Sequence, residues 1–171
     1  MTRECGTCTL CCKVMGIYAL DKPRGQWCEH AMPGRGCSIY ADRPQECRSF
    51  SCLWLLDDNL GPEWKPEKSK MVLVADETGR RTMVHVDAAA PDAWRRAPYH
   101  QRLLELMQAG LPLGRLVFIV VGERTGLLLP DERQGSRLED LGRLEQGDEV
   151  TLKRLGHPHA TRYEAVVTRR S

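Results

Sequence analysis

Hydrophobic residues follow a regular pattern only from residue 70 onward. A short apolar run over residues 71–75, a polar turn and an alternating segment over residues 82–87 predict a β-hairpin. The continuous run LVFIVV at residues 116–121 predicts a strand near the centre of a sheet, because both of its faces are apolar. Three further short segments have the spacing of strands: residues 127–129, 150–153 and 163–168.

One amphipathic helix is predicted between these strands. Asp92 is the expected N-cap, Pro98 suits the first turn, and Gly110 and Pro112 end the helix. Together with the strands, this helix predicts an α+β fold with five or six antiparallel strands and one main helix. The apolar face of the helix consists of Tyr99, Leu103, Leu106 and Met107.

Residues 1–56 have a different character. They contain all eight cysteines and many Gly and Pro residues, with little hydrophobic periodicity. Such a segment buries too little apolar surface to fold by itself. It therefore needs internal cross-links, such as bound metal ions. We therefore expect a small irregular metal-stapled cysteine-rich lobe at residues 1–56, a polar connector at 57–69 and a small α+β domain at 70–171.

Composition favours a reducing compartment for these cysteines. The chain has 171 residues and a net charge of +2 with scattered Lys and Arg, which gives no strong nucleic-acid signal. No apolar stretch reaches the ~20 residues of a membrane span, and the N-terminus lacks the apolar region of a secretory signal. We therefore expect a cytoplasmic protein without membrane contact, whose thiols bind metal or carry redox chemistry before they form disulfides.

The N-terminal cysteines have the spacing of metal ligands. In the motif Cys5-x2-Cys8-x2-Cys11-Cys12, the first three thiols can curl around one metal centre. Three thiolates from one loop are typical of cubane iron–sulfur sites, whereas zinc knuckles typically use one CxxC pair. Adjacent side chains diverge, so Cys12 cannot easily share the metal of Cys11, and at least two metal ions are expected. The remaining predicted ligands are Cys28, Cys37, Cys47 and Cys52.

The last two cysteines raise a question of geometry. Pro44 is expected to start a short helix that contains Cys47. If this helix continued to Cys52, the two thiols would lie about 140° apart around its axis. Either the helix ends near Ser49, or the two cysteines serve different metals.

Basic residues and one histidine surround the predicted ligands. Thiolates leave the site with excess negative charge, which basic side chains can offset from a second layer. His30 lies two residues after Cys28 and is the obvious nitrogen candidate, but eight thiols already satisfy two four-coordinate centres. We therefore expect His30 to support the ligands rather than bind metal. The basic residues expected in the same role are Lys13, Arg24, Arg35, Arg43 and Arg48.

The complete cysteine string resembles a known family. It runs from CxxCxxCC through a CxH pair at residues 28–30 to GCSIYxxRPxxCRxFxC at residues 36–52. This string is closely similar to the CxxCxxCC family of zinc- or iron-chelating domains, also called YkgJ-type cysteine-cluster proteins. The resemblance covers residues 5–52 and implies a bacterial, cytoplasmic, metal-binding protein. Some relatives are flagellin lysine N-methylases, but the chain has nothing that matches the rest of such an enzyme.

Three histidines outside the cluster carry weaker signals. His157 and His159 form a Pro-separated pair between two predicted strands, without Cys or acidic residues nearby. An exposed loop is therefore expected there rather than a metal site. His85 lies opposite Val84 and Val86 on its predicted strand, and we expect it at the surface or at a sheet edge.

Acidic and aromatic residues lie in the predicted connector and next to it. Asp57 and Asp58 precede a Gly-Pro turn and are expected to be solvated rather than catalytic. Trp54 and Trp64 are expected to pack the cysteine-rich lobe against the α+β part, in preference to forming a substrate platform.

These observations leave three hypotheses for function. The first is a metal-binding protein that holds a polynuclear zinc or iron(-sulfur) centre through its eight cysteines. The second is an iron–sulfur-dependent enzyme, either an oxidoreductase or a relative of protein-lysine methylases. The third is a zinc-stabilised nucleic-acid-binding module, which the near-neutral charge disfavours. No phosphate-binding loop or nucleophile elbow accompanies them, and the sequence identifies no protein partner.

Overall fold

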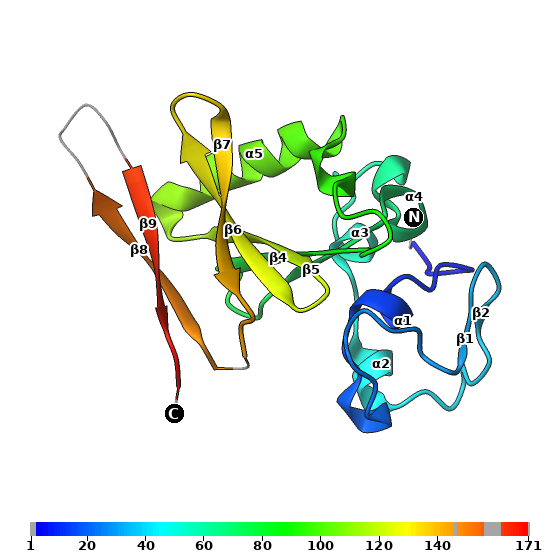
Figure 1. Ribbon diagram of the computed structural model, residues 1–171. Helices are drawn as coiled ribbons and strands as arrows, with labels where there is room; N and C mark the ends of the chain where they lie inside the picture. Colours follow the sequence, from blue (N-terminus) through cyan, green and yellow to red (C-terminus); the bar gives the residue numbers. More distant parts are fainter. Residues whose placement is uncertain (1–2, 146, 156–161, 171) are drawn as a thin grey trace.

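The computed structural model describes residues 3–145, 147–155 and 162–170. Three neighbouring parts are visible in Figure 1: an irregular cysteine-rich lobe, a sheet with one main helix, and a two-stranded hairpin on the side away from the lobe. This arrangement confirms the predicted α+β fold. Within the described ranges, no helix combines the length and the apolar character needed to cross a membrane.

A five-stranded sheet forms the centre of the fold. Its strand β5 is central, as predicted, but β4 and β5 are parallel where we expected antiparallel pairing throughout. The physical reason is the connection, because the chain crosses over through the main helix between these strands and therefore enters β5 in the direction of β4. In order across the sheet the strands are β3 (Met71–Ala75), β4 (Arg81–Val86), β5 (Leu116–Val121), β6 (Arg124–Asp131) and β7 (Gly135–Gly142).

The predicted helix is α5 (Tyr99–Gly110), which covers one face of the sheet (Figure 1). Its residues Leu103 and Met107 are buried in the main hydrophobic core, together with residues of β3, β4 and β5. Asp92 does not cap α5, because it precedes a separate short turn and makes no side-chain capping bond. The 3-10 turns on either side of α5 are η3 (Ala93–Arg95) and η4 (Leu111–Leu113).

The opposite face of the sheet is partly covered by the hairpin of β8 (Glu149–Leu155) and β9 (Arg162–Thr168). Val150 of this hairpin packs against Phe118 and Leu127 of the sheet. Both of its strands were predicted, whereas β7 was not. β7 lies at the edge of the sheet and has no fully buried residue, so its sequence carries no clear apolar alternation.

The cysteine-rich lobe consists of very short elements joined by turns. Backbone hydrogen bonds connect its segments, and part of it packs against the sheet. Leu10 and Val14 of the lobe are buried against Val72 of β3. The elements are α1 (Cys11–Val14), η1 (Tyr18–Leu20), β1 (Ala31–Met32), β2 (Gly36–Cys37), α2 (Gln45–Ser49) and α3 (Leu53–Leu56).

The predicted connector folds into η2 (Pro62–Trp64) and α4 (Pro66–Ser69). Trp64 is buried in the main core, and Trp54 packs against both that core and the cluster that joins lobe and sheet. The expectation that the two tryptophans pack the lobe against the sheet is therefore confirmed. The division of the chain into separate domains stays a prediction.

The expectation for His85 is wrong. This side chain is only 4% exposed, because the face of β4 opposite the main core is covered by the cysteine-rich lobe instead of by solvent. Its Nδ1 atom has no hydrogen-bond partner among the described residues. Val72 and Val120 are its neighbours on the adjacent strands.

Candidate metal centre

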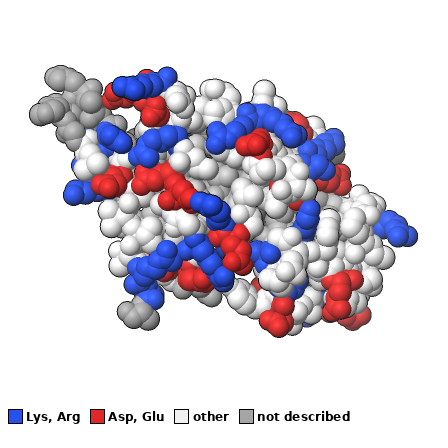
Figure 2. Space-filling view, in the orientation of Figure 1, with Lys and Arg blue, Asp and Glu red and all other residues white. Residues whose placement is uncertain are grey.

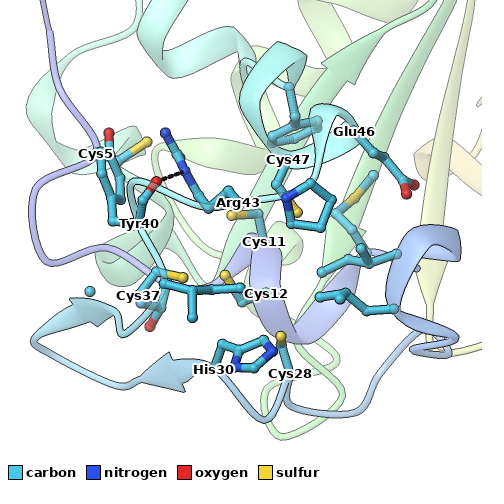
Figure 3. A pocket seen from close by; sticks show the side chains of 18 of the residues that line it. Cys5, Cys11, Cys12, Cys28, His30, Cys37, Tyr40, Arg43, Glu46 and Cys47 are labelled. Atoms are coloured by element: carbon cyan, nitrogen blue, oxygen red, sulfur yellow. Dashed lines mark hydrogen bonds between the residues drawn. The ribbon is translucent and has the colours of Figure 1, made fainter.

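Seven of the eight cysteines line one cavity in the cysteine-rich lobe, with a volume of about 150 Å³. Figure 3 shows sulfur atoms from separate segments turned toward a shared space, with the His30 ring beside Cys28. We call this space the thiol cavity. All eight cysteines of the chain are free thiols in the structure. The cysteines that line the cavity are Cys5, Cys8, Cys11, Cys12, Cys28, Cys37 and Cys47.

Local backbone geometry brings these segments together. Gly6 has a φ of +55°, and the amide of Cys8 donates to the carbonyl of Cys5, so the first CxxC forms a tight turn. The amide of Cys28 donates to the carbonyl of Cys12 over 2.9 Å, which fixes the middle segment against α1. Gly36 has a φ of +110° and brings β2 close to the first turn. Glycine is needed at both positions because an L side chain disfavours positive φ.

The helix that contains Cys47 ends at Ser49, which confirms the first of the two predicted alternatives. Cys52 then begins a new helix as the N-cap residue of α3, and its side chain is buried. It lies on a second, smaller hollow of about 20 Å³ instead of the thiol cavity. Cys5, Cys8 and Cys11 line both hollows, so the eight cysteines form one continuous group.

The donor chemistry of this group fits zinc or iron. Both metals take thiolate sulfur as a ligand, and His30 contributes an imidazole to the wall of the cavity. The cavity exceeds severalfold the ~10–15 Å³ that one water molecule requires. Within residues 3–145, 147–155 and 162–170, however, no three Cys, His, Asp or Glu side chains are arranged to hold a metal ion. The donors therefore share a space without forming a completed coordination sphere there.

The thiols differ in their acidity. The pKa of Cys11 lies above its ordinary value, because its thiol hydrogen-bonds to Cys12 and because it is buried. The same hydrogen bond lowers the pKa of Cys12 to about 7, and the positive charge of Lys22 acts in the same direction. Burial raises the pKa values of Cys5, Cys47 and Cys52. One thiol of the adjacent pair is thus favoured as a thiolate while its neighbour keeps its proton.

Lys22 is a residue of the site that sequence reasoning missed. It is 9% exposed, and its Nζ donates to the carbonyls of Lys13 and Met15 at the end of α1. Burial lowers its pKa, while the neighbouring thiols Cys28 and Cys12 act in the opposite direction. No local pattern identifies it, because Asp21-Lys22-Pro23 resembles an ordinary polar turn.

The residues predicted to support the ligands divide into two groups. His30 and Arg43 do line the thiol cavity, and Arg43 also lies 3.6 Å from the centre of the Tyr40 ring (Figure 3). Arg35 and Arg48 are exposed and do not line it, because the turn of β1–β2 and the outer face of α2 direct them to solvent. The expectation that these two support the ligands is therefore not met in the structure.

Lys13 and Arg24 are the two remaining basic residues that were expected to support the ligands. Lys13 donates to Asp87 at the end of β4. Arg24 lies close enough to the buried His85 to lower the pKa of that imidazole, although burial is the larger cause. Neither residue lines the thiol cavity.

Two other predicted features have different outcomes. Asp58 is exposed, and Asp57 accepts hydrogen bonds from the amide and side chain of Asn59, as suits a solvated turn. His157 and His159 lie outside the described residues, so the expectation of an exposed loop there stays a prediction.

Comparisons of the chain with protein-family models, with curated proteins and with solved structures found no match.

Proposed function

We propose that this protein binds metal through its eight cysteines and holds a polynuclear zinc or iron(-sulfur) centre. The observation that carries the proposal is the convergence of seven thiols on one cavity from separate segments of the lobe. Reduced cysteines rarely gather in this way without a ligand, because buried thiolates repel one another and thiols in contact oxidise. A bound cation removes both difficulties.

Two arguments favour at least two metal ions over one. Cys11 and Cys12 do not diverge as expected of adjacent residues, because their thiols hydrogen-bond to each other, so the case for two ions rests on the other thiols. The second hollow adds Cys52 to three thiols that it shares with the thiol cavity. Eight thiolates are also enough for two four-coordinate centres.

The resemblance to the CxxCxxCC family belongs to this proposal, as does a cytoplasmic location. Eight free thiols in one lobe support a reducing compartment, where glutathione and thioredoxin prevent disulfide formation. His30 and Arg43 are proposed to support the centre from the cavity wall. The imidazole can donate a hydrogen bond to a ligand, and the guanidinium offsets thiolate charge.

Anaerobic purification followed by elemental analysis and a visible absorption spectrum tests the proposal. A brown protein with iron and acid-labile sulfide would identify an iron–sulfur centre, whereas a colourless protein with about two zinc ions per chain would exclude it. Cys12→Ser should lose bound metal, while Thr7→Ser in the same N-terminal segment serves as the matched control. Absence of metal after reconstitution with zinc, or with iron and sulfide, would refute the proposal.

An iron–sulfur-dependent enzyme is the second candidate, as an oxidoreductase or a relative of protein-lysine methylases. It is favoured by a larger cavity of about 290 Å³ that adjoins the thiol cavity and shares Met15, Gly16 and Glu46 with it. A nucleic-acid-binding module is less favoured, because Lys and Arg are interspersed with Asp and Glu on the face shown in Figure 2. Incubation with substrate candidates under reducing conditions would separate an enzyme from a simple metal carrier.

A further inference from the structure

The larger cavity lies where the cysteine-rich lobe meets the sheet. The lobe contributes Lys22, Arg24 and Glu46 to its lining. Glu123, from the turn between β5 and β6, and residues 143–145, which follow β7, line it from the other side. We call it the charged cavity. Its volume of about 290 Å³ accommodates a small organic molecule rather than a single ion.

Most charges in the charged cavity are already engaged. Arg143 donates to Glu123 over 2.7 Å and forms an ion pair of 2.6 Å with Glu145. Lys22 donates to two backbone carbonyls of the lobe. These contacts leave little capacity in either side chain for a further ligand.

Two lining groups of opposite charge remain open. The guanidinium of Arg24 forms no hydrogen bond or ion pair with any residue within the described ranges. Glu46 accepts one hydrogen bond on Oε2 from the amide of Ala19, which leaves Oε1 open. In Figure 3 its carboxylate points away from the cysteine sulfur atoms, so it is available to a ligand in the charged cavity.

The balance of charge selects the class of ligand. Lys22, Arg24 and Arg143 offset three glutamates, so the six ionised side chains sum to zero. An anion or a cation alone would leave one charge of the cavity without compensation, whereas a zwitterion leaves none. The other members of the set are Glu46, Glu123 and Glu145.

We propose that the charged cavity binds a small zwitterion of the α-amino-acid class, with its carboxylate on Arg24 and its ammonium group on Glu46. This inference goes beyond metal binding. It places an organic ligand against Met15 and Gly16, which also line the thiol cavity.

Titration of the ¹⁵N-labelled protein, used as isolated, with three matched probes tests this inference. L-leucine carries both charged groups, isocaproate lacks the ammonium group and isoamylamine lacks the carboxylate. Leucine should shift the amide signals of Gly16 and Glu123 in a saturable way, with each matched compound at least about tenfold weaker. No saturable shift, or equal affinity for the three probes, would overturn the inference.

Two variants should separate the two contacts. Arg24→Ala should weaken leucine binding by at least about tenfold and leave isoamylamine unchanged, while Glu46→Gln should weaken leucine and leave isocaproate unchanged. Arg80→Ala and Glu77→Gln, both at exposed positions of the β3–β4 turn, are the matched controls and should change nothing. If Arg24→Ala and Glu46→Gln bound the three probes as their controls do, the assignment of the carboxylate to Arg24 and of the ammonium group to Glu46 would be contradicted.

Metal analysis of the same samples distinguishes the two proposals. Arg24 does not line the thiol cavity, so Arg24→Ala should keep the metal content of the parent protein. Leucine binding by protein that cannot be loaded with metal would overturn the proposed function alone. Loaded protein without leucine binding would overturn the zwitterion site alone.

Discussion

Nζ of Lys13 donates a 2.6 Å hydrogen bond to Oδ1 of Asp87, and this ion pair joins the cysteine-rich lobe to the sheet. Lys13 follows Cys12 directly in α1, and Asp87 follows the last residue of β4. The amide of Ala89 also donates to the same carboxylate oxygen. The position of α1, and with it the adjacent thiols, is thus tied to the end of a buried strand.

Lys13→Met should weaken this attachment. Both side chains are largely buried, so the substitution leaves the Asp87 carboxylate without its charged partner, and we expect a loss of about 1–3 kcal/mol in the free energy of unfolding. Urea unfolding followed by tryptophan fluorescence measures the change. Arg102→Met, which breaks an exposed pair with Glu105, should cost less than about 1 kcal/mol. Equal effects of the two variants would show that the Lys13 pair does not hold the lobe.

Loss of one central thiol should unfold the lobe and spare the sheet. Cys37→Ser removes a lining residue of the thiol cavity, and a structural metal would be the main source of folding energy for so small a segment. Limited proteolysis with mass spectrometry should show cleavage before residue 57 and a protected fragment that contains the sheet. Thr7→Ser, at an exposed position of the first turn, should digest like the parent protein. If the lobe of Cys37→Ser resisted proteolysis fully, bound metal would not be what stabilises it.

Metal uptake should release protons. Burial raises the pKa values of Cys5, Cys47 and Cys52, so these thiols are protonated in the metal-free protein near neutral pH and must lose their protons to bind. The apparent affinity should therefore fall as pH falls, by about tenfold per pH unit for each proton displaced. Calorimetry in buffers of different ionisation enthalpy counts those protons. An affinity that does not change between about pH 8 and about pH 6 would rule out thiolate coordination.

His85 should make stability depend on pH. Burial, with a smaller contribution from Arg24, lowers its pKa from 6.5 to about 4, so the folded protein keeps the imidazole neutral where the unfolded chain protonates it. Above pH 6.5 the imidazole is neutral in both states, so it does not reduce the free energy of unfolding. As the pH falls from 6.5 toward about 4, the unfolded chain takes up a proton that the folded protein does not. The free energy of unfolding then falls by up to about 1.4 kcal/mol per pH unit.

The test for His85 combines unfolding and NMR. Urea unfolding at pH values on either side of 6.5 gives the slope of the free energy of unfolding against pH. His85→Leu should reduce that slope by the contribution of the His85 imidazole. The ring signals of His85 should stay constant until the pH approaches about 4. Titration of those signals near 6.5 would show that the side chain is accessible to solvent.

The sequence alone determined the elements that depend on local periodicity. The pattern of Leu103 and Met107 predicted α5, and the apolar run of β5 predicted the central strand. Pro44 predicted the short helix that contains Cys47, and its end at Ser49 is one of the two alternatives that the spacing of the last two cysteines left open. These features follow from neighbours in the chain, so no knowledge of distant contacts was needed.

The sequence also predicted the members of the candidate site, because thiol spacing alone indicated a shared group, whereas metal binding by that group stays a prediction. His30 and Arg43 were predicted correctly as neighbours of that group. Arg48 was not, because the direction of an exposed helix residue depends on what the helix packs against. Lys22 was missed for the related reason that its burial requires the carbonyls of α1 to fold over it.

Only the tertiary structure decided which surfaces meet. The crossover through α5 made β4 and β5 parallel, and the lobe covered the face of β4 that holds His85. β7 became a strand through hydrogen bonds to β6 rather than through its own apolar pattern. The charged cavity likewise exists because Arg24 of the lobe and Arg143 beyond β7, far apart in sequence, line the same space. Such contacts join segments far apart in the chain, and local periodicity carries no information about them.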